Sequence, residues 1–339
     1  MSLINTNTGT LLAMLSYSRP HDGKTELEFT NRFIDTLPGV TKDSFGNSWI
    51  DIEGDGDDVL WSCHVDTITN FDAIQKIKII NGIASLDLPY IAPVTMPYIA
   101  PVTMPSFAHP AYNVINRSIK IKPYQGRVLG ADDSAGVFLM REMILAGKPG
   151  GYLFHRGEEH GGLGSAYVRD IEPLRLTPYC AAIALDRSKT NSIITHQFGE
   201  RTASDSFAAS LSKALSNAGL PGYKADRTGT FTDTAHYSEI ISECSNISVG
   251  YDHAHSADET LDIGFVMKLR DTLLKLDLSK LAIERDHAVQ DYVEDNYQGY
   301  PAYGSLVESI LDYPDTVAKI LREYGLDQDF LDAIRYKGQ

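Results

Sequence analysis

The chain has 339 residues, of which 43% are hydrophobic, so it can form one large domain or two ordinary ones around a sizeable core. Its formal net charge of −15 argues against a nucleic-acid or anionic-membrane surface, because both require a basic patch. Three cysteines without a C-x-x-C pair favour neither a disulfide framework nor a thiolate zinc site, and they indicate a reducing cytoplasm. We expect no signal peptide and no transmembrane segment.

The first third of the chain predicts two helices followed by two strands. Hydrophobic periodicity predicts amphipathic helices at 10–17 and 24–37. Strands are predicted at 48–52 and 59–63, and the turn residues around them indicate that these two strands form a hairpin. His64 and Asp66 then follow the second strand directly.

Residues 67–129 form an unusual inserted segment. One short strand is predicted at 77–86 and another at 118–123, on either side of a proline-rich middle. That middle contains a perfect duplication, in which PYIAPVTM occurs at 89–96 and again at 97–104. Four prolines in sixteen residues exclude a helix, so we expect an extended surface loop that serves as a lid or a small subdomain.

From Gly130 onward, predicted helices and strands alternate, which is typical of a sheet with helices on both faces. The helices are expected at 134–145, 204–218 and 263–276, and the strands at 152–155, 181–185 and 247–251. The prediction is therefore an α/β fold with a mixed sheet sandwiched between helices. We expect residues 1–280 to form the catalytic domain and 281–339 a helical C-terminal appendage.

Five short segments are rich in side chains that bind metals, and each is expected where a strand gives way to a loop. Such positions converge over one edge of an α/β sheet, where sites form. A hydrolytic zinc site needs imidazole and carboxylate ligands, an open position for water, and a further carboxylate to accept the proton of that water. The segments supply all of these groups: His64-Val65-Asp66, Gly130-Ala131-Asp132-Asp133, Gly157-Glu158-Glu159, Leu185-Asp186 and Asp252-His253-Ala254-His255.

Three of these motifs together resemble the dinuclear zinc exopeptidases, meaning the zinc aminopeptidase family and the related acetylornithine deacetylase/carboxypeptidase family. The motifs are HVDT at 64–67, LGADDSAG at 129–136 and GEEHGGLGS at 157–165. The resemblance covers roughly residues 10–276 in motif order. It implies the zinc-dependent exopeptidase fold, which is also called phosphorylase/hydrolase-like.

The resemblance also implies a role for each site residue. Asp132 would bridge two zinc ions, His64 and Asp186 would complete one ion, and Glu159 with a late histidine would complete the other. Glu158 would be the general base, and Asp66 would orient His64. In these families the late histidine precedes a Ser or Thr and an acidic residue, which favours His255 over His253. Other divalent metals such as Co²⁺ or Mn²⁺ suit the same ligands.

One further loop also resembles the families. Residues 229–235 are similar to their substrate-side loop, but Phe231 stands where the second glycine often lies, which leaves the backbone less permissive.

Spacing favours the aminopeptidase branch. Carboxypeptidase-type relatives insert a lid and dimerisation domain before the late histidine, and the 68 residues between Asp186 and His255 are too few for it. The 65 residues between Asp66 and Asp132 exceed what simple aminopeptidases need, and some multimeric relatives carry an oligomerisation subdomain there, which leaves a homo-oligomer open.

The sequence therefore predicts a cytoplasmic zinc-dependent hydrolase that cleaves a terminal amide bond of a small peptide-like substrate. Aminopeptidase activity is the first expectation, and an N-acyl amino acid deacylase or a carboxypeptidase is the alternative within the same families. A peptidase-like binding module without catalytic activity is the alternative from another functional class. Neither nucleic acid nor membrane is expected as a partner.

Overall fold

The computed structural model describes residues 6–88 and 127–287, which form one unit with a shared core. No helix within these ranges is long and apolar enough to cross a membrane. The duplicated segment at 89–104, the predicted strand at 118–123 and most of the predicted C-terminal helical appendage lie outside the described residues.

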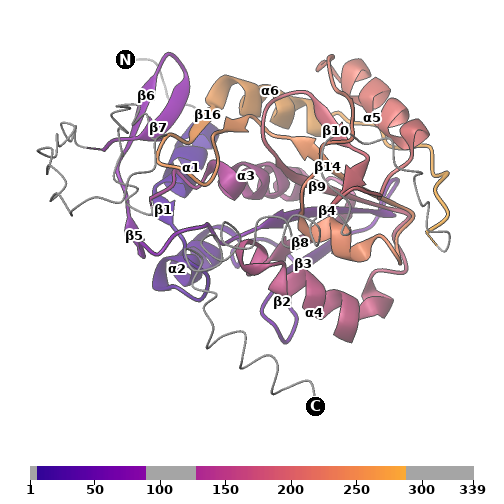
Figure 1. The fold of residues 1–339 in the computed structure, drawn as a ribbon, viewed down its shortest axis with the longest axis horizontal. Coiled ribbons are helices and arrows are strands. Elements are labelled where there is room, and N and C mark those ends of the chain that lie inside the picture. Colours follow the sequence, from indigo (N-terminus) through magenta and orange to yellow (C-terminus); the bar gives the residue numbers. More distant parts are fainter. Residues whose placement is uncertain (1–5, 89–126, 288–339) are drawn as a thin grey trace, which may run out of the picture. The chain divides into compact units, whose positions relative to one another are not determined.

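The central element is an eight-stranded mixed sheet, as the sequence predicted (Figure 1). Its four inner strands run parallel, in the order β14, β9, β4 and β8, while β3 and β10 pair with them antiparallel on either side. In chain order the strands are β2 Thr41–Lys42, β3 Ser48–Ile52, β4 Val59–His64, β8 Gly150–His155, β9 Ala181–Arg187, β10 Ser192–Ile194, β13 Lys224–Asp226 and β14 Glu243–Ser248.

The predicted hairpin between β3 and β4 is wrong, although both strands lie where expected. Strand β8 lies between them and pairs with both, so that Trp49 is opposite Leu153 and Trp61 is opposite Tyr152. All six residues of β8 are buried, and a central position gives this apolar strand a hydrogen-bonded partner on each edge. Turn residues show that the chain reverses, but they do not show whether another strand enters the gap.

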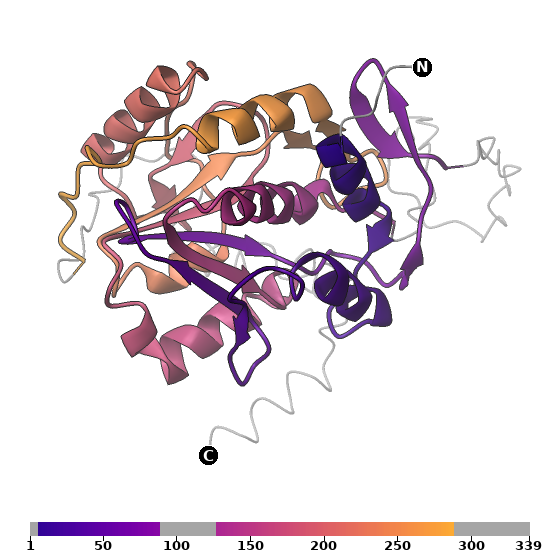
Figure 2. The same cartoon turned by 180° about the vertical axis from the view of Figure 1, so that it is seen from behind.

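Helices cover both faces of the sheet. One face carries α3 at its centre, packed against β4 and β9, with α1 and α6 alongside α3 (Figure 2). The other face carries α4 and the short 3₁₀ helix η3, Asp233–Tyr237. The helices are α1 Thr6–Leu15, α2 Lys24–Phe33, α3 Ala131–Leu145, α4 Leu163–Ile171, α5 Asp205–Asn217 and α6 Ile263–Leu273. The sequence did not predict α4.

Strand alternation divides the core into two clusters. Trp61 and Phe154 pack with α3 and its neighbours, whereas Leu60 and Leu153, one position earlier, pack with Val168 of α4. Successive side chains of a strand point to opposite faces, so a strand with helices on both sides must be apolar throughout. This burial fixes the strand ends rigidly, and those ends carry the site residues.

A smaller sheet extends from the inserted segment. The single strand predicted at 77–86 is instead two strands, β6 Ile77–Ile80 and β7 Ile83–Leu86, joined by Asn81-Gly82 with φ values of 52° and 82°. Asn-Gly with two positive φ values is the preferred two-residue hairpin connection. Strand β7 pairs with β16 Thr260–Asp262, which in turn pairs with β15 Tyr251–Asp252. The β6–β7 hairpin of the inserted segment therefore pairs with a strand that flanks the loop with His255.

Candidate metal centre

Six predicted site residues converge at the carboxyl ends of the parallel strands. His64 is the last residue of β4, Asp186 lies near the end of β9, and Glu158 and Glu159 follow β8. Asp132 lies in the first turn of α3, and His255 lies in the loop between β15 and β16. The carboxyl edge of an open α/β sheet is where ligand sites form, because loops from neighbouring strands meet there.

Asp132 lies between the two histidines. Its Oδ1 is 3.0 Å from Nε2 of His64, and its Oδ2 is 3.3 Å from Nε2 of His255. One carboxylate thus presents each of its oxygens to a different imidazole, an arrangement suited to bridging two cations. His253 lies apart from this group and faces Asp252, with its Nδ1 3.8 Å from the carboxylate.

The remaining carboxylates complete two neighbouring sets. His64 Nε2 is 3.6 Å from Asp186 Oδ1 and 3.9 Å from Glu158 Oε2. His255 Nε2 is 3.2 Å from Glu159 Oε2. Asp132, Glu159 and His255 place ligand atoms within 4.8 Å of one another, and so do His64 and Asp186 together with Asp133.

The electrostatics of this cluster suit bound cations. Burial lowers the pKa of His64, but Asp186 and then Asp132 raise it to a net value well above its usual range. Hydrogen bonds that the His255 imidazole donates to Asp132 and Glu159 raise the pKa of His255 to about 11. Burial raises the pKa of Glu158 well above its ordinary value, and His64 opposes that shift. Buried carboxylates in excess of positive charge favour a divalent ion, and the imidazole and carboxylate donors present fit zinc.

The turn that carries Asp132 is held by a buried carboxylate that the sequence analysis missed. Glu259 accepts the backbone N–H of Gly130 through Oε2 and that of Asp132 through Oε1, each at 2.9 Å. Gly130 has a φ of 72°, in the left-handed region that favours glycine. Burial raises the pKa of Glu259 to about 8. Its position four residues after His255 was visible in the sequence, but its partner was not.

The carboxylate of Asp66 mainly contacts the loop that carries the two glutamates. Its Oδ1 accepts the backbone N–H groups of Gly157 and Glu158 at 2.9 and 3.1 Å, and Oδ2 accepts that of Glu159 at 3.2 Å. His64 contacts Asp66 chiefly through the main chain, because Nδ1 lies 3.1 Å from the Asp66 carbonyl and 3.7 Å from its Oδ1. The fully buried Asp66 therefore orients both β4 and the 157–159 loop.

A buried arginine connects two of the site loops. Arg19 donates from Nε to the Val65 carbonyl at 2.6 Å and from Nη1 to the Ser134 hydroxyl at 2.8 Å. Its Nη2 lies 3.4 Å from the Gly130 carbonyl. Burial lowers its pKa to about 10, so it stays charged at neutral pH. A lone arginine after a short strand gave no sequence signal for this role.

Asp186 is held by three neutral side chains. Thr232 donates its hydroxyl to Oδ2 at 2.7 Å, and the Tyr251 hydroxyl lies 3.1 Å from Oδ1. The Asn246 side chain exchanges two hydrogen bonds with the Asp186 backbone, at 2.7 and 3.0 Å. Thr232 belongs to the 229–235 loop, in which Phe231 packs its ring against His236 at 4.9 Å between centroids. The loop thus contacts the site despite its missing glycine.

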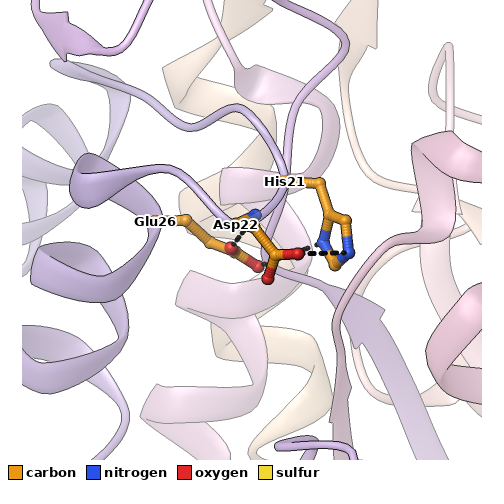
Figure 3. A group of neighbouring side chains, drawn as sticks. All are labelled: His21, Asp22 and Glu26. Atoms are coloured by element: carbon orange, nitrogen blue, oxygen red, sulfur yellow. Dashed lines mark hydrogen bonds and ion pairs between the residues drawn. The ribbon is translucent and has the colours of Figure 1, made fainter.

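A second group of metal-type side chains, His21, Asp22 and Glu26, lies beside the 157–159 loop (Figure 3). Arg156 already occupies its carboxylates, with Nε 3.0 Å from Glu26 Oε1 and Nη2 2.8 Å from both Glu26 Oε2 and Asp22 Oδ1. A bidentate guanidinium satisfies a carboxylate in charge and geometry. This group therefore fits an ion-paired support for Arg156 and the loop after it better than a cation site.

Solved structures share this fold. The aminopeptidase PepT from Bacillus cereus ATCC 10987 is 13% identical with a TM-score of 0.57, over 79% of this chain and 96% of that one. A tripeptidase from Staphylococcus aureus subsp. aureus Mu50 is 13% identical with a TM-score of 0.55 over the same shares. PhTET1-12s, described as a dodecamer, is 16% identical with a TM-score of 0.52, over 81% of this chain and 98% of that one.

No protein-family model and no curated protein matches the sequence. The fold of the chain is nevertheless the one that the resemblance to dinuclear zinc exopeptidases predicted.

Proposed function

We propose that the protein is a zinc-dependent aminopeptidase, which removes the N-terminal residue of a small peptide. The observation that carries this proposal is the position of Asp132, whose two oxygens face His64 and His255 separately. Carboxylates from two further strand ends flank this arrangement, and one glutamate remains beyond the ligands that two ions need.

In this proposal His64 and Asp186 would hold one ion, Glu159 and His255 would hold the other, and Asp132 would contribute to both. When bound, the ions supply Lewis acidity toward a substrate carbonyl and lower the pKa of water. Zinc suits these nitrogen and oxygen donors, and Co²⁺ or Mn²⁺ would fit them as well.

Glu158 acts as the general base. It accepts a proton from the attacking water and delivers that proton to the leaving amine, so the residue ends each cycle in its starting state. The hydrogen bonds from the 157–159 backbone to Asp66 keep Glu158 in place. Glu158 is largely buried, which limits competition from bulk water for its carboxylate.

The connection between Asp186 and His255 supports the aminopeptidase branch. Residues 187–254 form sheet strands, α5 and η3 of the central unit, and this leaves no room for an inserted lid domain. We assign the catalytic domain to 1–280 and a helical C-terminal appendage to 281–339. A homo-oligomer is part of the proposal, since PhTET1-12s is a dodecamer, and so is a cytoplasmic location.

The test is hydrolysis of free-amine, N-acylated and C-terminally free dipeptides by protein that is first chelated and then restored with zinc. We expect cleavage of free-amine substrates only, with about two zinc ions per chain by elemental analysis. Glu158→Gln should lower kcat by about 10²- to 10⁴-fold without loss of zinc. Glu28→Gln, on the exposed face of α2, is the matched control and should retain full activity.

Each other outcome changes the assignment in a defined way. Preference for N-acylated substrates would indicate the deacylase or carboxypeptidase alternative with the same metal site. Absence of bound zinc, together with equal behaviour of the Glu158→Gln and native proteins, would exclude the hydrolase and leave a binding module.

A further inference from the structure

A cavity of about 170 Å³ opens beside the proposed metal ligands. Its lining includes the proposed site residues Asp132, Glu158 and Asp186. The lining also includes Arg187, Ile194, Gln197 and Phe231, to which the proposed chemistry assigns no role. A substrate held at the metal centre would place its nearest groups in this cavity.

Among the described residues that line this cavity, Arg187 is the one with a permanent positive charge. Its Nη2 donates to the carbonyl and to the hydroxyl of Thr228, both at 3.1 Å. Its Nε is buried, and within the described ranges it has no hydrogen-bond acceptor. The described residues thus give the guanidinium hydrogen bonds through Nη2 alone, and its remaining donors suit a planar anion bound in the cavity.

The carboxylate nearest to Arg187 does not fill that place. Asp226 Oδ2 lies 3.9 Å from Nη2, beyond hydrogen-bonding distance. Neutral donors occupy the oxygens of Asp226, with Ser192 Oγ on Oδ2 at 2.7 Å and the Thr228 backbone and hydroxyl on Oδ1 at 2.8 and 2.7 Å. Asp226 therefore stabilises the 226–228 turn and makes no hydrogen bond to the guanidinium of Arg187.

Gln197 presents the opposite polarity in the same cavity. Its Nε2 is 3.2 Å from the Thr234 hydroxyl and 3.5 Å from the Cys244 carbonyl. Because a carbonyl can only accept a hydrogen bond, the amide nitrogen of Gln197 must be the atom on this side. Its Oε1 is buried and has no donor in the part of the chain that the structure describes. The cavity wall thus offers a cationic donor and a neutral acceptor, which suits a carboxylate together with a nearby N–H.

We propose that Arg187 binds a carboxylate of the substrate and so selects acidic peptides for the adjacent centre. This inference rests on the proposed aminopeptidase function and names its substrate class. The carboxylate can belong to the side chain of an N-terminal Glu or Asp, or to the free C-terminus of a very short peptide. Both sources present the same planar anion to the guanidinium.

Two matched pairs of substrates separate these sources. Glutamyl and glutaminyl anilides have the same shape and differ in the side-chain carboxylate. Leu-Ala and Leu-Ala amide differ in the terminal carboxylate. In the pair whose carboxylate reaches Arg187, we expect kcat/KM to be roughly 10- to 100-fold higher for the substrate with the carboxylate. This is the range of a charge-assisted hydrogen bond. Leucyl anilide, which has neither carboxylate, reports on the aminopeptidase function alone.

Variants assign the preference to Arg187. Arg187→Gln should reduce the ratio within the pair to about one while leaving leucyl anilide turnover within a factor of about two. Arg187→Lys should retain part of the ratio, because it keeps the charge and loses the planar fork. Arg169→Gln removes the same charge from the exposed face of α4 and should leave the ratio unchanged.

The inference is overturned if the native protein shows kcat/KM ratios near one in both pairs, or if the ratio persists in Arg187→Gln. Cleavage of leucyl anilide would in either case still support the aminopeptidase function. An equal loss on all substrates in Arg187→Gln would assign the residue to support of the 226–228 turn instead. If no substrate is cleaved, the proposed function fails. Calorimetric titration of the zinc-loaded protein with the same pairs then measures the charge preference without turnover.

Discussion

A buried pair behind the site, His155 and Asp233, gives the prediction that can be worked out furthest. His155 Nδ1 is 3.2 Å from Asp233 Oδ2, and its Nε2 is 2.6 Å from the Tyr237 hydroxyl. Both members of the pair are fully buried. Burial lowers the pKa of His155 from 6.5 to about 3, and burial raises the pKa of Asp233 from 3.8 to about 8. At neutral pH both side chains are therefore uncharged in the folded protein.

Over one range of pH, the pKa shifts of His155 and Asp233 have opposite and equal effects on the pH dependence of the free energy of unfolding. Between about pH 4 and 6.5 the folded pair holds one proton, on Asp233, and the unfolded chain also holds one, on His155. Equal proton binding means that the pair adds no slope to the free energy of unfolding in this window. Above pH 6.5 the folded state holds the extra proton, so stability falls as the pH rises toward 8.

Asp233→Asn removes one side of this balance. Below pH 6.5 the unfolded variant binds a proton at His155, whereas the folded variant does not, because the folded pKa is about 3. The free energy of unfolding of the variant therefore decreases as the pH falls from 6.5 toward 3. At 1.36 kcal/mol per pH unit, the variant should lose about 2.5 kcal/mol relative to the native protein between pH 6.5 and 4.5.

Urea unfolding of metal-free protein at these two pH values measures this difference. The control variant His155→Gln leaves Asp233 alone with its raised pKa, so it should instead gain stability as the pH falls from 8 toward 4. Parallel pH profiles for Asp233→Asn and the native protein would refute the assignment of the proton to this pair.

Three further substitutions test how the site is held. Asp66→Ala leaves the three backbone N–H groups of 157–159 without their acceptor, so we expect a loss of about 2–4 kcal/mol in urea unfolding and a fall in kcat at unchanged zinc content. Gly136→Ala brings a methyl group against the Leu185 carbonyl, where α3 meets β9, and should lower stability and zinc affinity together; an unchanged Tm would contradict this contact. Phe138→Ala opens a cavity beneath the same helix and should cost about 3–5 kcal/mol by urea unfolding while leaving zinc stoichiometry intact.

Local patterns in the sequence predicted most of the elements, whereas the candidate site residues rested on those patterns together with a family resemblance. The helix predicted at 24–37 forms at 24–33, and the strands predicted at 48–52 and 59–63 form at 48–52 and 59–64, because side-chain periodicity reflects local backbone geometry. Residue types marked the segments that contain the site residues, and the resemblance to the dinuclear zinc exopeptidases implied the roles of His64, Asp132, Glu158, Glu159 and Asp186. The choice of His255 over His253 followed from the residues after it, and the structure places His255 beside Asp132 and Glu159.

Tertiary structure decided which segments meet. The position of β8 between β3 and β4 depends on pairing between strands far apart in the chain, and neighbouring turn residues carry no information about that choice. The roles of Arg19, Glu259 and Arg187 likewise depend on partners far away in the sequence, such as Ser134, Gly130 and Thr228. The sequence by itself determined which chemical groups the site contains, because ligand chemistry belongs to residue types. Their spacing, support and unsatisfied donors arose only when the folded chain brought distant backbone and side-chain groups into contact.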